Sequence, residues 1–387
     1  MNSSFLLVVG LLWLLGLATD FLGRVTTLPR VTLLLLFGVL LGQDAMGLIP
    51  ESVIVAFPMI TDMALLLVGF LLGGKISISD LRDTGKAVFW YSSCAVLFTV
   101  AVVFIGLWAV GVHWALALLL AGIASATDPA ATLDVVRQKK SDGPFSRTLL
   151  GVVAIDDAWG LIVFSFIIST ASLAIGNSNT LDIIMHALHE LGGSALLGVV
   201  LGVPMAYLTG RIKPGEPTLV EALGVVFLCG GLADYFQVSF LLSAMVLGAT
   251  VSNLALHHDR PFHAIEDIEW PFMILFFILT GASLQFANTV DVFGLTAGYV
   301  VFRSLGRALS SWPAGFMSNS SVSTQRWMGL ALLPQAGVAS GMALLAGQSF
   351  PAWQTTLLSI TILSTIIFEI GGPVLTGRIL DKVDRDE

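Results

Sequence analysis

Residues 121–136 read AGIASATDPAATLDVV, an apolar run that is interrupted in its middle by Thr127, Asp128 and Pro129. Asp is favoured as the residue before a helix and Pro at the first helical position, so these letters are typical of a helix start. The stretch therefore predicts one membrane span made of two half-helices with unwound backbone between them. A continuous helix with a proline kink is the alternative.

The composition places this span in a membrane protein. Hydrophobic residues make up 56% of the 387 residues, charged residues only 11%, and the mean hydropathy is +0.90. Soluble domains carry about 25% charged residues. The formal net charge of −8 is spread mostly over loops and gives no reason to expect nucleic-acid binding. Cys94 and Cys229 lie in apolar runs, so we expect inert buried thiols and no disulfide or metal ligand.

Apolar runs long enough to cross a bilayer recur from end to end, and we expect about thirteen of them. The N-terminal run has no basic region and no cleavage site, so it is predicted to be the first span and not a signal peptide. A short polar stretch, GLADYFQVS (231–239), is predicted to separate the eighth span from the ninth. The predicted spans cover residues 4–23, 31–48, 55–73, 87–110, 115–136, 148–172, 183–208, 219–234, 236–256, 270–287, 292–316, 327–347 and 353–376.

Lysine and arginine residues support this count, because they concentrate in short cytoplasmic loops. With the N-terminus outside, 16 of the 18 Lys and Arg residues fall in inside segments and none falls in an outside loop. The inside residues are Arg24, Arg30, Lys75, Arg82, Lys86, Arg137, Lys139, Lys140, Arg147, Arg211, Lys213, Arg260, Arg326, Arg378, Lys382 and Arg385. The pattern predicts a multi-pass protein of the plasma membrane with a cytoplasmic C-terminus.

Two adjacent carboxylates lie inside the sixth span, in GVVAIDDAWGLIVF (151–164). Nine residues from Arg147 at 1.5 Å per residue place Asp156 roughly 13 Å deep, near the middle of the bilayer. Ionisable residues at that depth are costly and are functional candidates by default. Asp156 and Asp157 are therefore candidate site residues. A structural hydrogen bond between helices is the alternative.

The second half of the chain repeats the arrangement of the first. GLALLPQAGVASGMALL (329–345) is interrupted by Pro334 and Gly337 at the place where Asp128 and Pro129 interrupt the fifth span. Spans one to six and eight to thirteen then form two inverted six-helix repeats around span seven. Interrupted segments at matched positions of two repeats indicate a transporter's substrate site at the bilayer midplane.

A buried arginine is predicted in VVFRSLGRALSSW (300–312), because Arg303 lies twelve residues, roughly 18 Å, inward from Asp291. A guanidinium at this depth needs an acidic partner. Asp156 is one candidate, and Glu369 in STIIFEIGGP (364–373) is the other. Arg307, one turn closer to the cytoplasm, is expected to snorkel to that surface and to have a structural role.

The order of ATDPAAT, AIDDAWG, FRSLGR and LLPQAGVASG along the chain resembles the cation:proton antiporter superfamily, in its double-aspartate sodium/proton exchanger type. The resemblance covers nearly the whole chain. It implies a core bundle, residues 85–175 and 291–380, that carries two crossed discontinuous helices. This bundle would move like an elevator against a dimerisation scaffold, residues 1–84 and 219–290, with 176–218 as linker helix. A homodimer is implied as well.

By this resemblance, Asp157 is the essential carboxylate that binds the cation or the proton, and Asp156 occupies the preceding, variable position. Thr127 and Asp128 line or cap the crossover, which Pro129, Pro334 and Gly337 interrupt. Two residue types depart from the family pattern. Double-aspartate members commonly carry Lys where this chain has Arg303. Members with Arg often carry Glu where it has Val152 and Val153.

The chemistry of the two carboxylates supports the same function. A desolvated carboxylate binds either a proton or a small hard cation through the same oxygens, so competition between the two couples their movements. We therefore expect a non-enzymatic antiporter without cofactors that serves pH homeostasis. It would exchange H⁺ for Na⁺, or for Li⁺ or K⁺, with Asp156 and Asp157 as Na⁺ ligands.

Three other functions fit the sequence less well. An intramembrane aspartyl protease needs two acids that face each other, whereas neighbouring residues on a helix point about 100° apart, and the chain has no GxGD stretch. A sodium-coupled symporter of an organic solute on a related inverted-repeat fold is the main alternative. A cation channel lacks support because no stretch resembles a selectivity filter of backbone carbonyls.

Overall fold

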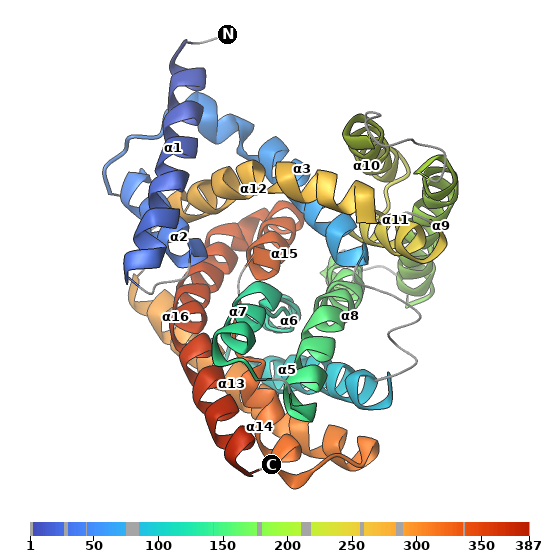
Figure 1. Cartoon of the computed structure of the whole chain (residues 1–387). Helices are drawn as coiled ribbons and strands as arrows, with labels where there is room; N and C mark the ends of the chain where they lie inside the picture. The colour runs from blue at the N-terminus through green and yellow to red at the C-terminus, as the bar shows by residue number, and fades with distance from the viewer. Residues whose placement is uncertain are drawn as a thin grey trace. The chain divides into compact units, whose positions relative to one another are not determined.

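The computed structural model describes residues 3–26, 30–43, 45–74, 85–141, 143–175, 180–209, 218–255, 259–283, 289–335 and 337–386. Within these ranges the regular elements are fifteen α-helices and one short 3-10 helix (Figure 1). The first helices are α1 (Ser3–Thr26), α2 (Arg30–Leu41), α3 (Glu51–Gly74), α5 (Gly85–Ala109), α6 (Trp114–Ile123), α7 (Pro129–Lys139), α8 (Pro144–Ile175) and α9 (Thr180–Thr209). The others are α10 (Thr218–Tyr235), α11 (Phe240–Leu254), α12 (Asp259–Ala282), α13 (Thr289–Ser318), α14 (Val322–Ala331), α15 (Gly337–Ser349), η1 (Pro351–Trp353) and α16 (Gln354–Asp386).

These helices match the predicted spans in number and order, although α2 ends at Leu41, before the predicted end at residue 48. The thirteen spans correspond to fifteen α-helices because two spans are each divided, one into α6 and α7 and the other into α14 and α15. The predicted break between the eighth and ninth spans is also present, since α10 ends at Tyr235 and α11 begins at Phe240. By length and composition, five helices of the described chain are long and apolar enough to cross a membrane, and four shorter helices are apolar.

Two helices extend well beyond the predicted spans. We expected the tenth span to begin at residue 270, but α12 begins at Asp259. We expected the last span to end at residue 376, but α16 continues to Asp386. The added turns carry charged residues, which form helix readily in water but are excluded by a hydropathy pattern.

The chain divides into two compact units. Unit 1 comprises residues 1–55, 84–164 and 277–387 and contains both divided spans, whereas unit 2 comprises residues 56–83 and 165–276. This division places α1 and α2 with the divided spans, whereas the predicted elevator division placed residues 1–84 in the scaffold. Compactness does not identify the part that moves, so the division into core, scaffold and linker helix stays a prediction.

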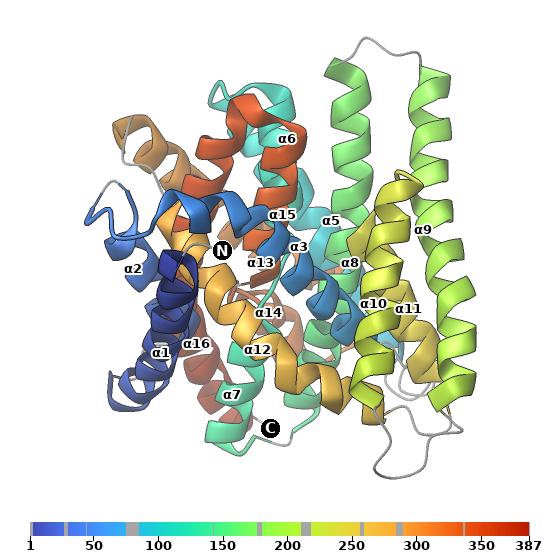
Figure 2. The same cartoon turned by 90° about the horizontal axis from the view of Figure 1, so that it is seen from above.

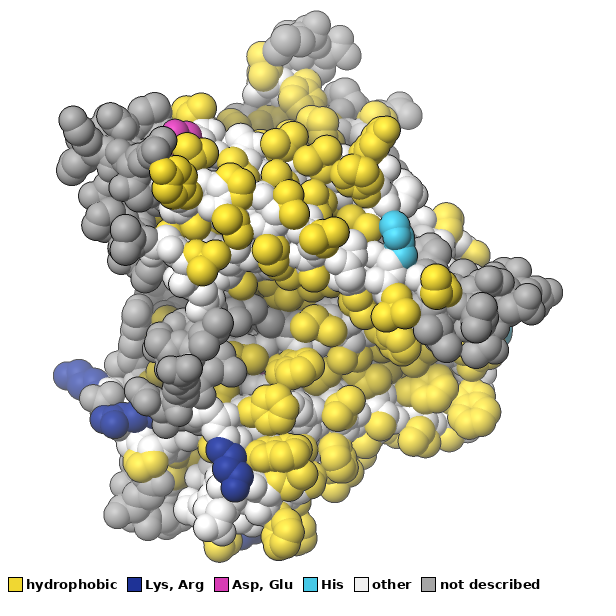
Figure 3. Space-filling model, turned by 90° about the vertical axis from the view of Figure 1, so that its right-hand side faces the viewer, with side chains coloured by type: hydrophobic (Ala, Val, Ile, Leu, Met, Phe, Trp, Pro, Cys, Tyr) yellow, Lys and Arg dark blue, Asp and Glu magenta, His cyan; other side chains and the backbone are white. Residues whose placement is uncertain are grey.

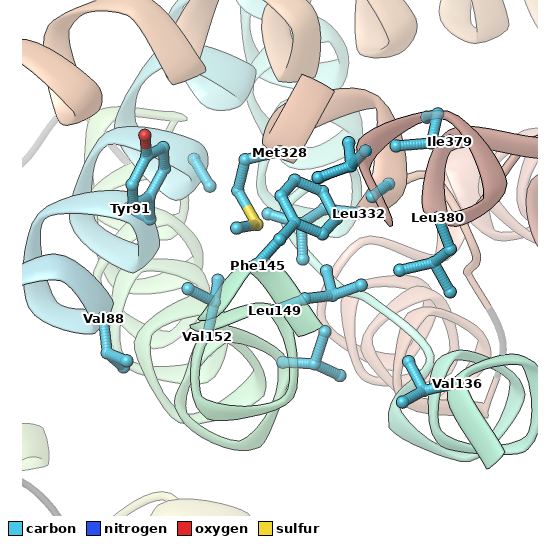
Figure 4. Packing of buried hydrophobic residues seen from close by; sticks show 14 of the residues in the cluster. Val88, Tyr91, Val136, Phe145, Leu149, Val152, Met328, Leu332, Ile379 and Leu380 are labelled. Carbon is cyan, nitrogen blue, oxygen red and sulfur yellow. The ribbon is translucent and has the colours of Figure 1, made fainter. Parts of the chain in front are cut away.

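An apolar cluster in unit 1 fixes α8 against the ends of α7, α14 and α16 (Figure 4). Lipid is as apolar as these side chains, so close packing, and not escape from water, is what stabilises their contact. Residues 145, 149 and 152 recur at helical spacing and so share one face of α8. Members of this cluster are Val136, Phe145, Leu149, Val152, Met328, Leu332, Ile379 and Leu380.

In unit 2, α9, α10 and α11 lie side by side, as Figure 2 shows. Residues 56–74 of α3 pack on this group, where Phe70 stacks on Phe262 with 4.7 Å between ring centroids. The Ser252 hydroxyl donates a hydrogen bond to the Gly74 carbonyl over 2.8 Å. The face of the molecule in Figure 3 is covered largely by hydrophobic side chains, with Lys and Arg gathered toward one edge. This distribution is that of a lipid-facing surface.

Candidate cation site

Two interrupted helices form the centre of unit 1. Helix α6 ends at Ile123 and α7 begins at Pro129, and in the second half α14 ends at Ala331 and α15 begins at Gly337. The predicted interruptions at Pro129 and Gly337 are confirmed, and Pro334 lies in the second unwound segment. Each interruption leaves backbone N–H and C=O groups without helical partners, and these groups must be satisfied by other atoms.

The two unwound segments form hydrogen bonds with one another. The backbone N–H of Asp128 donates to the Pro334 carbonyl over 3.0 Å. The Gln335 side-chain amide donates to the Ile123 carbonyl over 3.2 Å and to the Tyr299 hydroxyl over 3.1 Å. These bonds join the first unwound segment to the second, so the divided spans meet at their interruptions. We call this meeting point the crossover.

Arg303 on α13 binds both segments of the crossover. It is fully buried, and its guanidinium donates to the carbonyls of Ala124, Ala126 and Leu333 over 3.0, 2.8 and 2.7 Å. It also lies over the Phe368 ring, 4.2 Å from the centroid. Because α6 and α14 end at these carbonyls, the guanidinium meets the negative ends of both helix dipoles. The prediction that Asp156 or Glu369 pairs with Arg303 is therefore wrong; backbone carbonyls hold this arginine.

The arginine that pairs with Asp156 is Arg307 and not Arg303. Its Nη1 atom lies 2.8 Å from Asp156 Oδ2, and both side chains are fully buried. Its Nη2 atom donates to the Ser125 carbonyl. The prediction that Arg307 snorkels to the cytoplasmic surface is thus wrong. The four-residue spacing could have indicated the result, because residues 303 and 307 share one face of a helix and both reach the crossover.

The remaining candidates surround the same point. Thr127 is 2% and Asp128 7% exposed, and Thr132 donates to the Asp128 carbonyl over 2.9 Å in the first turn of α7. Glu369 on α16 is 1% exposed, and its Oε1 atom has no hydrogen-bond partner among the described residues. Asp157 follows Asp156 on α8. Its side chain, like that of Pro129, lies outside the described part of the structure.

A close backbone contact between α16 and the crossover supplies a test of this geometry. A Cβ atom on Gly372 would lie 2.9 Å from both the Cα and the N of Pro334, whereas one on the neighbouring Gly371 would meet no atom within 4 Å. We expect Gly372→Ala to lower stability by about 1–3 kcal/mol through overpacking and to slow transport. Gly371→Ala should be neutral or slightly stabilising. Thermal unfolding of both purified variants checks this, and equal effects would contradict the packing described.

Crossed discontinuous helices that enclose carboxylates and arginines in a membrane bundle define an ion-coupled transporter. The family model described as "Sodium/hydrogen exchanger, transmembrane" matches residues 7–382. The chain therefore belongs to the sodium/hydrogen exchanger family, whose members are transporters and not enzymes.

Relatives of nearly the same length are named as cation/proton antiporters. The ammonium/H⁺ antiporter subunit AmhT of Alkalihalophilus pseudofirmus is 22% identical, over 96% of this chain and 94% of its own. The K⁺/H⁺ antiporter subunit KhtU of Bacillus subtilis is 23% identical, over 91% and 89%. The solved structure of the sodium proton antiporter MjNhaP1 from Methanocaldococcus jannaschii superposes with a TM-score of 0.80 over 97% of each chain at 18% identity. The predicted fold class is confirmed, and the symporter alternative finds no support.

Proposed function

We propose that the protein exchanges Na⁺ for H⁺ at Asp157, by alternating access across the plasma membrane. The observation that carries this proposal is the buried Arg307–Asp156 pair. It neutralises the first carboxylate of the pair at mid-membrane depth and leaves the second, adjacent in sequence, to bind a cation or a proton. Thr127 and Asp128 at the crossover would complete the ligand set with oxygen atoms, which suit hard cations.

The identity of the cation requires a direct assay, because relatives carry ammonium, K⁺ and Na⁺ in their names. Purified protein in liposomes with an imposed pH gradient would receive Na⁺, K⁺, Li⁺ or NH₄⁺ in turn, with a pH-sensitive dye inside. Na⁺ is expected to dissipate the gradient at the lowest concentration. Absence of any cation-dependent proton flux would contradict the proposed function.

We expect a stoichiometry of one proton per cation. Arginine keeps its proton in proteins, so Arg307 holds Asp156 ionised by direct contact throughout the cycle. Asp157 is then the member of the aspartate pair that exchanges its proton. Initial rates and reversal points of exchange, measured in liposomes with the membrane potential clamped at several values, should not depend on potential. A potential dependence expected for two protons per cation would show that a second carboxylate carries protons.

The orientation in the membrane, the oligomeric state, the moving part and the physiological role belong to the same proposal. The arrangement of lysines and arginines supports an outside N-terminus and a cytoplasmic C-terminus. The resemblance supports a homodimer in which the core bundle, residues 85–175 and 291–380, moves like an elevator against the scaffold, residues 1–84 and 219–290. Exchange of this kind would serve pH homeostasis.

A further inference from the structure

Two cationic side chains from different helices lie over the same tryptophan ring in unit 1. The Cζ atom of Arg326 on α14 is 5.3 Å from the centroid of the Trp327 ring, and the Nζ atom of Lys382 on α16 is 4.8 Å from it. Cations within about 6 Å of an aromatic face are attracted to it. Trp327 packs against the apolar cluster between α8, α14 and α16, so its ring is held in place. The two positive charges therefore lie close together where α14 meets the end of α16 (Figure 1).

These two charges have no acidic partner in the part of the chain that the structure describes. Its two ion pairs join Lys139 to Asp381 and Arg307 to Asp156. Asp381, the neighbour of Lys382 in the sequence, is thus engaged by another lysine. Arg326 and Lys382 are both exposed. Like charges that share one small surface repel each other, so an anion bound between them would be stabilised.

The helix that precedes α14 carries an apolar surface down to the same end of the bundle. Exposed hydrophobic side chains recur at helical spacing along one face of α13, which joins α14 through residues 319–321. The face ends in two large aromatic side chains, Trp312 at 74% and Phe316 at 85% exposed. On α14, Val322 is 80% exposed and precedes Arg326 by four residues, so the two share one helix face. The members on α13 are Val301, Leu305, Leu309, Trp312 and Phe316.

This combination of side chains is typical of the boundary between lipid headgroups and acyl chains. Tryptophan is enriched at that boundary, and in the predicted topology this end of α13, α14 and α16 is cytoplasmic. Basic residues beside the cytoplasmic ends of membrane helices attract anionic lipids. Arginine binds phosphate oxygens in pairs, whereas lysine acts as a point charge. A phosphodiester headgroup with acyl chains matches both the charges and the exposed apolar face, whereas a soluble phosphate matches the charges alone.

We propose that Arg326, Lys382 and Trp327 bind the headgroup of an anionic phospholipid from the cytoplasmic leaflet. Its acyl chains lie on the exposed apolar side chains at the end of α13. The headgroup joins α14 to α16, and these helices are already bonded nearer the crossover, where the Thr376 hydroxyl donates to the Ala331 carbonyl over 3.1 Å. A ligand that binds the folded state raises its stability, so the lipid should stabilise this pair of helices.

The experiment compares two lipids that differ in headgroup charge. Purified full-length protein in neutral detergent would receive equal amounts of phosphatidylglycerol or phosphatidylcholine with the same acyl chains. We expect phosphatidylglycerol to raise the midpoint of thermal unfolding more than phosphatidylcholine does. In Arg326→Gln/Lys382→Gln this difference should disappear. Native mass spectrometry of the retained lipid should show affinity for phosphatidylglycerol falling about fivefold for each charge removed.

A matched double variant separates a built site from general attraction to a basic surface. Lys140→Gln/Arg147→Gln removes the same charge from the same unit. Both side chains are exposed, and neither has a ring contact or an ion pair among the described residues. This variant should keep the wild-type difference between the two lipids.

Three outcomes would overturn the proposal. The two lipids could stabilise wild-type protein equally, the two double variants could lose the difference equally, or inorganic phosphate at the same concentration could replace phosphatidylglycerol. If Arg326→Gln/Lys382→Gln does not fold, the single variants carry the test through their fivefold losses of affinity. The readouts are stability and lipid retention, so the proposed function fails separately, by absence of cation-dependent proton flux in liposomes.

Discussion

Asp157→Asn is expected to abolish cation-driven proton exchange while the protein still folds and inserts. Asparagine keeps the size of the side chain, but an amide neither binds a proton at physiological pH nor neutralises a cation. The Arg307–Asp156 pair remains intact in this variant, so no buried charge is left alone. Dye-reported proton flux in liposomes, at matched protein density, measures the effect.

The matched control is the same substitution in an exposed ion pair. Asp381 on α16 lies 2.5 Å from Lys139, and its side chain is 43% exposed. Asp381→Asn should retain exchange near the wild-type rate, because this carboxylate lies at the solvent-exposed end of the bundle. Normal turnover in Asp157→Asn would remove Asp157 from the mechanism, whatever the control shows.

Breaking the Arg307–Asp156 pair is expected to cost about 3–5 kcal/mol of stability. Either Asp156→Asn or Arg307→Gln leaves a charge uncompensated in a fully buried position. Arg307→Gln also removes the donor to the Ser125 carbonyl, so it should be the more damaging of the two. Unfolding of the purified variants in lipid nanodiscs measures the loss.

Two comparisons make this prediction specific. The double variant Asp156→Asn/Arg307→Gln removes both charges and should recover part of the stability lost by the single variants. Lys139→Met breaks an ion pair of similar length at the surface and should cost at most about 1 kcal/mol. If the buried and exposed pairs contribute equally, burial does not govern the strength of the Arg307–Asp156 pair.

The sequence predicted the helices and their interruptions because the signals are local. Asp128 before Pro129 marks a helix start, and Pro334 with Gly337 interrupts an apolar run at the matched place. Both interruptions are present in the structure. The carboxylates were predicted from their depth alone, since a charge inside an apolar span has few explanations.

The pairing of the arginines could not be predicted in this way. Counted from the loops, Arg303 lies closer than Arg307 to the bilayer depth of Asp156. This depth does not show which hydrogen-bond acceptors surround each guanidinium. The unwound backbone supplies carbonyls that the helical pattern hides, and Arg303 takes three of them. Once these acceptors hold Arg303, Arg307 is the arginine that reaches Asp156.

The bonds across the crossover bear on the direction of transport. Arg303 and Gln335 tie the first unwound segment to the second, and the Asp128 backbone adds a third tie. A site fastened from both repeats keeps its ligands at the same spacing whether it opens inward or outward. We therefore expect the protein to bind its cation with equal affinity from either face. Cation import and cation export would then follow the same mechanism in opposite directions. The ion gradients of the cell would set the direction of net exchange.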